Sequence, residues 1–348
     1  MASVVRVGIE QLSWDVELMN VNDACKLRRI DKINVQTPLL VPSFSSVVFE
    51  EAFRPDMYAK LSDVITDASL FSAYDLHLGK IAQEAIWVSE VVFIDSGNYE
   101  VEHIEKILAQ FRKSIDGRPK KWTFQMYART VDSLKPPPFR KGVLVNYDEK
   151  KEVSEQISKA HEFFKRHEQF ASCFLCKPSD KSSHELDIES LINSAKSIDQ
   201  FDVLGLTEKE LGNSLLSRCT NILKIRNALD SIGSNRPIHI FGCLDPIGIV
   251  CYFLCGADIF DGTLWLKFGF HENAAFYINN YAILKKTWNR TDGGVQVMSW
   301  MSNLRDLTAL MYRMRRYAQL HDENLLEFDD AIKKEIKDLT ETAAVNVR

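Results

Sequence analysis

The chain has 348 residues, of which 45% are apolar and 26% charged, the composition of an ordinary globular protein. Its net charge of -5 excludes a protein that is basic overall, so a nucleic-acid site would have to be a local basic patch. The sequence has no run close to the roughly 20 apolar residues of a membrane span, and its start lacks the apolar core of a signal peptide. We therefore expect a cytoplasmic protein that does not enter a membrane.

Short β-rich runs alternate with longer helical patterns along the chain, which predicts βαβ units and a parallel sheet. Helical patterns cover residues 153–169, 185–198, 211–232 and 246–255. Residues 61–66 are a candidate for an eighth strand, so we predict an α/β fold, a (β/α)8 TIM barrel. The seven candidate strands are Ile33–Val41, Val91–Ile94, Val143–Tyr147, Ser172–Leu175, Asp202–Leu204, Pro237–Phe241 and Ala257–Phe260.

Two features outside this alternation suggest how the chain is organised. Glycine and proline near both ends of residues 116–140 indicate a loop insertion in a barrel domain of residues 1–281. Apolar residues at helical spacing over Leu304–Leu320 favour a helical extension of residues 282–340. The small, polar residues 341–348 are expected to form a frayed tail.

The seven cysteines are an odd number in a long chain, and most lie in apolar surroundings. This pattern is typical of reduced thiols in a protein core. Only Cys173 and Cys176 have the spacing of metal ligands, without a second pair or a histidine partner. We therefore predict a protein without a metal or other cofactor.

Two aspartates end strand-like runs and are followed at once by glycine-containing turns. Asp95 follows Val91–Ile94, and Asp261 follows Ala257–Phe260. In a barrel of parallel strands, such carboxylates lie on the face where active sites are built. The alternative for each aspartate alone is a turn residue, because aspartate and glycine are common in turns.

Both aspartate segments resemble a known family. The hexapeptide from Asp95 to Glu100, Asp-Ser-Gly-Asn-Tyr-Glu, resembles the Asp-Ser-Gly-Gly-(Phe/Tyr)-Gln signature of the tRNA-guanine transglycosylases. Residues 256–261 resemble the segment that carries their nucleophilic aspartate. Weaker matches follow the family's order at residues 37–42, 143–149, 204–206 and 238–242, so that the resemblance covers about residues 30–320.

The resemblance implies a double displacement at a ribose-type C1′ carbon. Asp261 would be the nucleophile, which displaces guanine and forms a covalent aspartyl-glycosyl intermediate, as in retaining glycosidases. Asp95 would be the general acid and base, a task that requires a raised pKa. The incoming base then resolves the intermediate.

The resemblance also implies residues that bind the base. Tyr99 would stack on it, with a core tyrosine as the alternative. Asp148 would accept hydrogen bonds from the guanine N1–H and amino group, or would be a solvated charge. Gly205 would let the base edge approach the backbone, or would be a strand-end turn. Ser96 is counted with them because it lies in the signature.

The chain departs from the family at several positions. Glu100 replaces a glutamine and could alter which base is preferred, because a carboxylate accepts hydrogen bonds but donates none. Trp265 and Lys267 stand where the family has Pro-Thr-Arg, and they offer a stacking face and a phosphate-seeking charge for nucleic acid, with packing and a solvated lysine as the alternatives. The family's zinc module has no counterpart, which puts tRNA as the substrate and the usual dimer in doubt.

The expected function is therefore a guanine transglycosylase that exchanges guanine for a 7-deazaguanine base in nucleic acid. The missing zinc module and the changed Pro-Thr-Arg position slightly favour DNA over tRNA. The alternatives are a tRNA-guanine transglycosylase proper and a non-catalytic accessory subunit with the same barrel. An unrelated barrel enzyme acting on a phosphorylated metabolite ranks lowest, because no glycine-rich phosphate loop is evident near the last strands. A protein partner could supply basic surface that the chain lacks.

Overall fold

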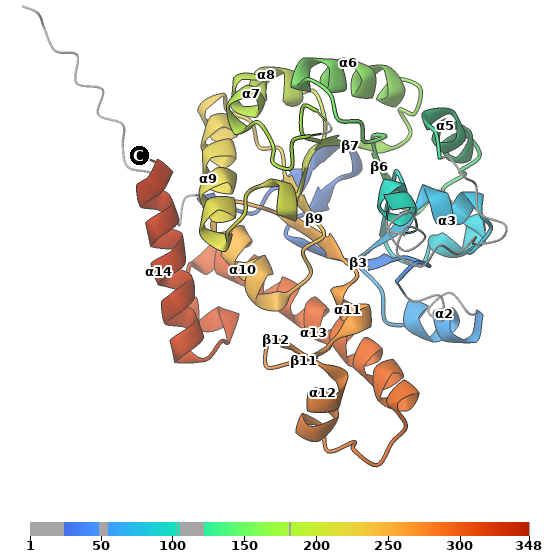
Figure 1. Ribbon diagram of the computed structural model, residues 1–348, viewed down its shortest axis with the longest axis vertical. Coiled ribbons are helices and arrows are strands. Elements are labelled where there is room, and N and C mark those ends of the chain that lie inside the picture. The colour runs from blue at the N-terminus through green and yellow to red at the C-terminus, as the bar shows by residue number, and fades with distance from the viewer. Residues whose placement is uncertain (1–23, 49–54, 103, 105–121, 181, 348) are drawn as a thin grey trace, which may run out of the picture.

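A closed barrel of parallel strands forms the centre of the protein (Figure 1). The computed structural model describes residues 24–48, 55–102, 104, 122–180 and 182–347. Around the barrel the strand order is β10-β3-β4-β5-β6-β7-β8-β9. The prediction of a (β/α)8 barrel is therefore confirmed, as is the helical extension that follows it. No helix in the described ranges is both long and apolar enough to cross a membrane.

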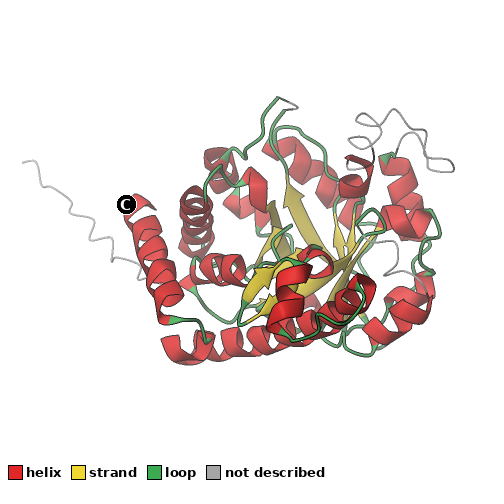
Figure 2. Ribbon diagram, turned by 60° about the horizontal axis from the view of Figure 1, so that its bottom comes forward, coloured by secondary structure: helices red, strands yellow, loops and turns green. Residues whose placement is uncertain are grey.

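The barrel strands are buried on both faces, because side chains fill the inside and helices cover the outside (Figure 2). They are β3 (Leu39–Phe44), β4 (Ala68–Ser72), β5 (Val91–Asp95), β6 (Lys141–Val145), β7 (Ala171–Cys176), β8 (Val203–Thr207), β9 (Ile238–Phe241) and β10 (Ile259–Gly262). Strand β10 closes the barrel by pairing with β3 on one side and β9 on the other.

The helices of the outer ring begin at clear capping signals. Ser214 and Ser217 form a capping box at the start of α9, and the Asp245 side chain accepts from the Gly248 N–H at the start of α10. The helices before β10 are α2 (Pro55–Ser62), α3 (Ala73–His77), α5 (Phe124–Asp132), α6 (Val153–Phe164), α7 (Ile188–Asn193), α8 (Ala195–Ile198), α9 (Leu215–Ser231) and α10 (Pro246–Leu254).

The chain after β10 adds a small hairpin and three longer helices to the barrel. Helix α13 packs against β3 and α14 against α9, so both join the outer ring. These elements are α11 (Leu264–Lys267), β11 (Gly269–His271), β12 (Ala274–Phe276), α12 (Ile278–Leu284), α13 (Asp292–Leu320) and α14 (Asp330–Val347). A second hairpin, β1 (Arg29–Ile30) and β2 (Val35–Gln36), precedes the barrel, and 3-10 turns lie at Asp31–Ile33, Gln83–Ile86, Glu208–Glu210 and Glu323–Leu326.

The expected strand at residues 61–66 is wrong. This stretch ends α2 and enters a loop, and the strand is β4, which begins at Ala68. Two serines interrupt the apolar run of β4, so the apolar pattern does not predict this strand. Ser69 is nevertheless buried, and its hydroxyl forms a hydrogen bond with the Ser89 hydroxyl at 2.7 Å. The first strand also begins later than expected, because the β1–β2 hairpin occupies residues up to Gln36.

The frayed tail expected at residues 341–348 is also wrong, because α14 continues to Val347. Ile336, Thr340 and Ala343 lie on one face of this helix and are buried. The small side chains of Thr340 and Ala343 let α14 pack against α9, and the Thr340 hydroxyl donates to the Ile336 carbonyl at 3.0 Å. Residues that look too small and polar for a core therefore suit a helix interface.

The segment expected to be an insertion, residues 116–140, contains a helix of the barrel repeat. Helix α5 lies between β5 and β6, where the repeat places a helix. Residues 116–121 lie outside the described residues, so the insertion as a whole stays a prediction.

A buried ion network supports the strand that carries Asp261. Arg28 donates through Nη1 to Asp258 Oδ1 at 3.0 Å, and Asp258 Oδ2 accepts from the Ile238 N–H at 2.9 Å. Arg226 lies beside Gly256, whose φ is +95°, and a Cβ at Gly256 would lie 2.6 Å from Arg226 Cγ. Asp258 therefore joins the chain before β1, the start of β9 and the start of β10.

Removing the Asp258 carboxylate would take the nearest counter-charge from buried Arg28 and the acceptor from the Ile238 N–H, while Asp230 remains 2.9 Å from Arg226 and 3.8 Å from Arg28. We expect Asp258→Ala to lower the free energy of unfolding by ~3–5 kcal/mol, measured by urea denaturation. The control is Asp63→Ala at an exposed aspartate after α2. A loss at Asp258 no larger than the loss at Asp63 would contradict this account of the network.

Candidate active site

The structure brings Asp95, Asp148 and Asp261 together at one end of the barrel. Asp95 ends β5, Asp261 is the next-to-last residue of β10, and Asp148 follows β6. Because the strands are parallel, their carboxyl ends meet on one face. The charges of Asp148 and Asp261 both act on Asp95, so the three carboxylates share one site.

The Asp261 carboxylate is held from two sides. The Ser43 hydroxyl on β3 donates to Oδ2 at 2.7 Å, and Nε2 of His239 on β9 lies 3.0 Å from Oδ1. These strands are the two neighbours of β10, and the Asp261 residue is 5% exposed. Sequence analysis missed both partners; the one signal was a histidine in the otherwise apolar strand β9.

Asp95 has the protonation behaviour that acid and base chemistry requires. Burial and the negative charges of Asp148 and Asp261 raise its pKa to about 7, although the Gly97 N–H, which donates to Oδ2 at 3.2 Å, opposes the rise. Near neutral pH this carboxyl can therefore both give and take a proton.

The turn after Asp95 positions Asp148. Gly97 has φ +89°, and a Cβ there would lie 2.5 Å from the Cβ of Tyr74, so glycine is required. The Ser96 hydroxyl donates to Asp148 Oδ1, and the Asn98 amide donates to the same oxygen at 2.6 Å. Ser96 is 1% exposed and its hydroxyl orients Asp148, so direct binding of the base by Ser96 stays a prediction.

Curated proteins similar to the chain are transglycosylases. A tRNA-guanine(15) transglycosylase of Methanocaldococcus jannaschii is 24% identical over 272 residues, 73% of this chain and 38% of the relative. The protein of the same name from Methanococcus aeolicus is 22% identical over 249 residues, 69% of this chain and 36% of the relative. The chain is a relative of the tRNA-guanine transglycosylases. It spans less than two fifths of the length of these relatives. No family model matches it.

Two residues of the signature differ in exposure within this transglycosylase-like barrel. Tyr99 is 46% exposed and is hydrogen-bonded to Thr263, just after β10, so its ring lies at the surface beside Asp261. Glu100 is 3% exposed, and burial together with the charges of Asp75 and Asp95 raises its pKa well above the ordinary range. Burial therefore favours the protonated form of Glu100, in which a carboxyl both donates and accepts as a glutamine does.

The structure gives Gly205 a packing role. It lies within β8, so it is not a strand-end turn. A Cβ at Gly205 would lie 2.8 Å from the Phe241 ring and 3.1 Å from the Leu175 Cα. The missing side chain therefore makes room for Phe241 inside the barrel.

The expectation that Trp265 stacks on nucleic acid is wrong. Its side chain is fully buried, its Nε1–H donates to the Ser43 carbonyl at 3.1 Å, and its ring meets the edge of Phe44 at 5.3 Å. Trp265 therefore packs against the strand that carries Ser43. Lys267 is exposed at the end of α11, and the nearby Lys209 adds a second positive charge.

In the ranges that the structure describes, the residues of the transglycosylase-like barrel do not suit a zinc site like that of the family. No group of three or more His, Cys, Asp or Glu side chains there could hold a metal. Cys173 and Cys176 lie three apart on β7, so they project to opposite faces of the strand. All seven cysteines are buried and free.

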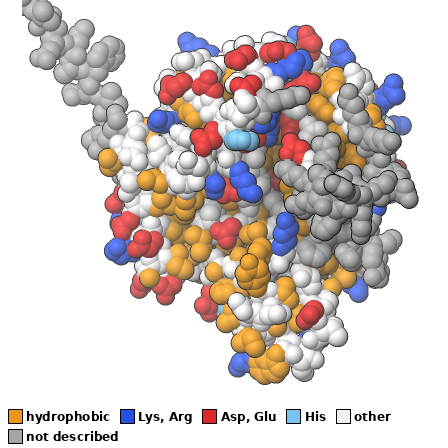
Figure 3. Space-filling view, in the orientation of Figure 1, with side chains coloured by type: hydrophobic (Ala, Val, Ile, Leu, Met, Phe, Trp, Pro, Cys, Tyr) orange, Lys and Arg blue, Asp and Glu red, His pale blue; other side chains and the backbone are white. Residues whose placement is uncertain are grey.

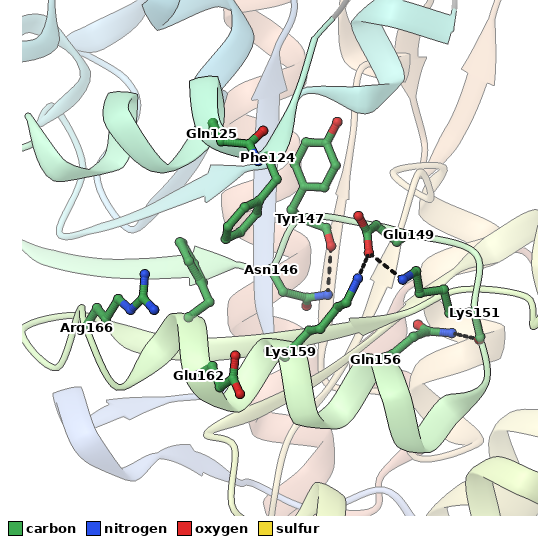
Figure 4. A pocket seen from close by; sticks show the side chains of 12 residues that line it. Phe124, Gln125, Asn146, Tyr147, Glu149, Lys151, Gln156, Lys159, Glu162 and Arg166 are labelled. Atoms are coloured by element: carbon green, nitrogen blue, oxygen red, sulfur yellow. Dashed lines mark hydrogen bonds and ion pairs between the residues drawn. The ribbon is translucent and has the colours of Figure 1, made fainter.

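A separate cavity of about 300 Å³ lies between α5 and α6 (Figure 4). The rings of Phe124, Tyr147 and Phe163 line it, and Glu149 at its edge pairs with Lys159 at 2.6 Å. Its lining includes neither Asp95 nor Asp261. It borders the outer side of the loop that carries Asp148.

The raised pKa of Asp95 has a consequence for stability. Its pKa of about 7 in the fold exceeds the ~3.9 of an unfolded aspartate, so the folded state binds more protons and loses stability as pH rises from about 4 to about 7. We therefore expect Asp95→Asn to raise the melting temperature more at pH 8 than at pH 4, measured by scanning calorimetry. Asp63→Asn is the control at an exposed aspartate. An equal effect at both pH values would contradict the shifted pKa.

Proposed function

We propose that the protein exchanges guanine for a 7-deazaguanine base in nucleic acid through an aspartyl-glycosyl intermediate. The observation that carries the proposal is the pair of Asp261, fixed by two donors, and Asp95, with a pKa of about 7, at one barrel face. The names of the relatives, tRNA-guanine(15) transglycosylases, support the same reaction class.

The two carboxyl groups divide the proposed chemistry between them. A lone pair of Asp261 forms a bond to C1′ while the bond from C1′ to guanine N9 breaks, and the departing base takes the proton of Asp95. In the second displacement the incoming base gives a proton to Asp95, attacks C1′ and releases the Asp261 carboxylate. Two inversions retain the configuration at C1′.

Asp148 and Tyr99 are proposed to bind the base. Among the described residues, the side-chain bonds to the Asp148 carboxylate go to Oδ1, and Oδ2 can accept from the guanine edge. Tyr99 is exposed enough for its ring to stack on a purine. The base would have to leave its stack to reach Asp261, either from a duplex or from a single strand.

The polymer that carries the base is open to direct test. The preference for DNA over tRNA stays a prediction, whereas the named relatives point to tRNA. A non-catalytic accessory subunit would have no use for an Asp95 with a pKa near 7 beside a fixed Asp261. A protein partner that adds basic surface also stays a prediction.

A local basic and aromatic surface supports nucleic acid as the substrate. Figure 1 shows α12 projecting from the barrel at the bottom of the view, and Figure 3 shows hydrophobic side chains gathered there. The sequence from residue 273 to residue 291 has no Asp or Glu. This surface follows α11 and β11–β12, which begin where β10 ends beside Asp261. Together with Lys267, its exposed aromatic and basic side chains are Tyr277, Lys286, Trp288 and Arg290.

Base exchange is tested by incorporation of radiolabelled guanine into matched tRNA and DNA. We expect label in one polymer with the wild type, and a loss of about a thousandfold or more with Asp261→Ala, because the nucleophile is removed. Asp63→Ala is the control. No label in either polymer, with guanine binding intact, would refute the enzymatic proposal in favour of an accessory subunit.

The α12 surface is tested by nucleic-acid binding. We expect Trp288→Ala to weaken binding by about 1–3 kcal/mol through the loss of one stacked base, and Arg290→Glu to reduce its salt dependence. Fluorescence anisotropy over a range of salt concentrations measures both. Tyr312→Ala is the matched control, since Tyr312 is a 50% exposed aromatic further along α13. Equal effects at Trp288 and Tyr312 would contradict a role for this surface.

A further inference from the structure

We propose that His239 is a positioning residue for the nucleophile. It keeps its hydrogen bond to Asp261 Oδ1 through both displacements, so that Oδ2 is the atom that attacks C1′. This inference rests on the proposed function and adds a residue that the sequence analysis did not single out.

The two donors that hold Asp261 come from opposite sides. His239 Nε2 lies 3.0 Å from Oδ1, and the Ser43 hydroxyl lies 2.7 Å from Oδ2. An ionised carboxylate only accepts hydrogen bonds, so the histidine proton of this contact is on Nε2. Each oxygen therefore has one donor, and the plane of the carboxylate is fixed.

The His239 ring cannot easily turn away from Asp261. It is fully buried, stacks on the Phe241 ring at 3.8 Å between centroids with an interplanar angle of 26°, and meets the edge of Phe93 at 5.2 Å. The Phe241 ring occupies the space that Gly205 leaves free. Gly205, Phe241 and His239 thus form one packed row that ends at the nucleophile.

The second ring nitrogen supports the same tautomer. In the described part of the chain, Nδ1 of His239 is buried and has no hydrogen-bond partner. A proton on Nδ1 would be a buried donor without an acceptor, and Nε2 would then face the Asp261 carboxylate with a lone pair. Both costs disappear when Nε2 carries the proton.

The two donors differ in what they can do during the reaction. The Ser43 hydroxyl can rotate about its Cβ–Oγ bond, whereas the packed imidazole cannot. When an Oδ2 lone pair forms the bond to C1′, the C1′–N9 electron pair leaves with guanine, and Oδ1 becomes the carbonyl oxygen of the ester. This oxygen still accepts from His239. When the incoming base breaks the C1′–Oδ2 bond, its electron pair returns to the carboxylate, and the same N–H stabilises the returning charge.

Two substitutions separate the donor from the ring. His239→Phe keeps an aromatic ring and loses the donor, and His239→Gln restores an N–H at a similar reach while it loses the ring. We expect His239→Phe to lower kcat for guanine exchange about 10- to 100-fold, the usual range for a hydrogen bond to a charged group. We expect KM for guanine to stay within about twofold and the melting temperature to fall by only a few degrees, because Asp261 loses one buried donor while the ring packing is kept. The steady-state fraction of covalent adduct on denaturing gels should rise, because the second displacement loses the N–H that stabilises the returning charge. His239→Gln should recover part of kcat.

Each other outcome overturns the role of His239. A wild-type kcat in His239→Phe would show that the donor is not needed. A collapse of the melting temperature, or a KM change that accounts for the loss, would assign the residue to packing. His239→Gln no better than His239→Phe would show that the ring matters and the donor does not.

A readout without exchange separates this inference from the proposed function. If the wild type exchanges no guanine, the proposed function fails. The NMR signals of the imidazole nitrogens still show which ring nitrogen of His239 carries the proton. In nitrogen-15 NMR spectra we expect the proton of the His239 imidazole on Nε2, with a shift of this signal in Asp261→Ala. A proton on Nδ1, or a chemical shift that does not change in Asp261→Ala, would overturn the inference.

Discussion

The site depends on the closure of the barrel by β10. This strand pairs with β3 in a register that sets Asp261 beside Val41, and with β9 in a register that sets Ile259 beside His239. Side chains alternate between the two faces of a strand, so a slip of one residue would turn Asp261 out of the barrel and away from both donors. The buried network around Asp258, directly before β10, holds the start of this strand. The register of backbone pairing thus determines toward which face of the barrel wall the Asp261 carboxylate points, and the side-chain contacts then hold it there.

Three carboxylates at one barrel face repel one another when all are ionised. Each of the three has different hydrogen-bond partners, so they do not have the same tendency to take up a proton. Asp261 accepts from two side chains, and Asp148 accepts from the Ser96 hydroxyl and the Asn98 amide. Asp95 is the member that burial and its two charged neighbours drive toward protonation, with the Gly97 N–H as a weak opposing contact. Asp95 is therefore the carboxyl to which the proposed mechanism assigns the proton transfers.

The sequence predicts the barrel well because most of its strands are runs of branched and aromatic residues between clear turn signals. It misses β4, whose buried Ser69 finds its hydrogen-bond partner in Ser89 only within the fold. It also misplaces the helical end of the chain, whose small residues suit an interface with α9. The two aspartates are recognisable because a local motif surrounds each one. Ser43 and His239 are not, since only the closed barrel brings these single residues to Asp261. The burial of Trp265 is likewise a property of the packed fold.

The departures from the family signature place polar side chains beside the carboxylates of the site. Asn98 stands in place of a glycine, and its amide holds Asp148. Glu100 stands in place of a glutamine, and burial together with the charges of Asp75 and Asp95 raises its pKa, which favours the protonated form that donates and accepts as the amide would. In the proposed exchange Asp95 gives its proton to the departing base, and the resulting negative charge beside Glu100 raises the pKa of Glu100 further. Loss of the proton from Asp95 therefore makes loss of the proton from Glu100 less favourable, so the two carboxyls do not ionise together.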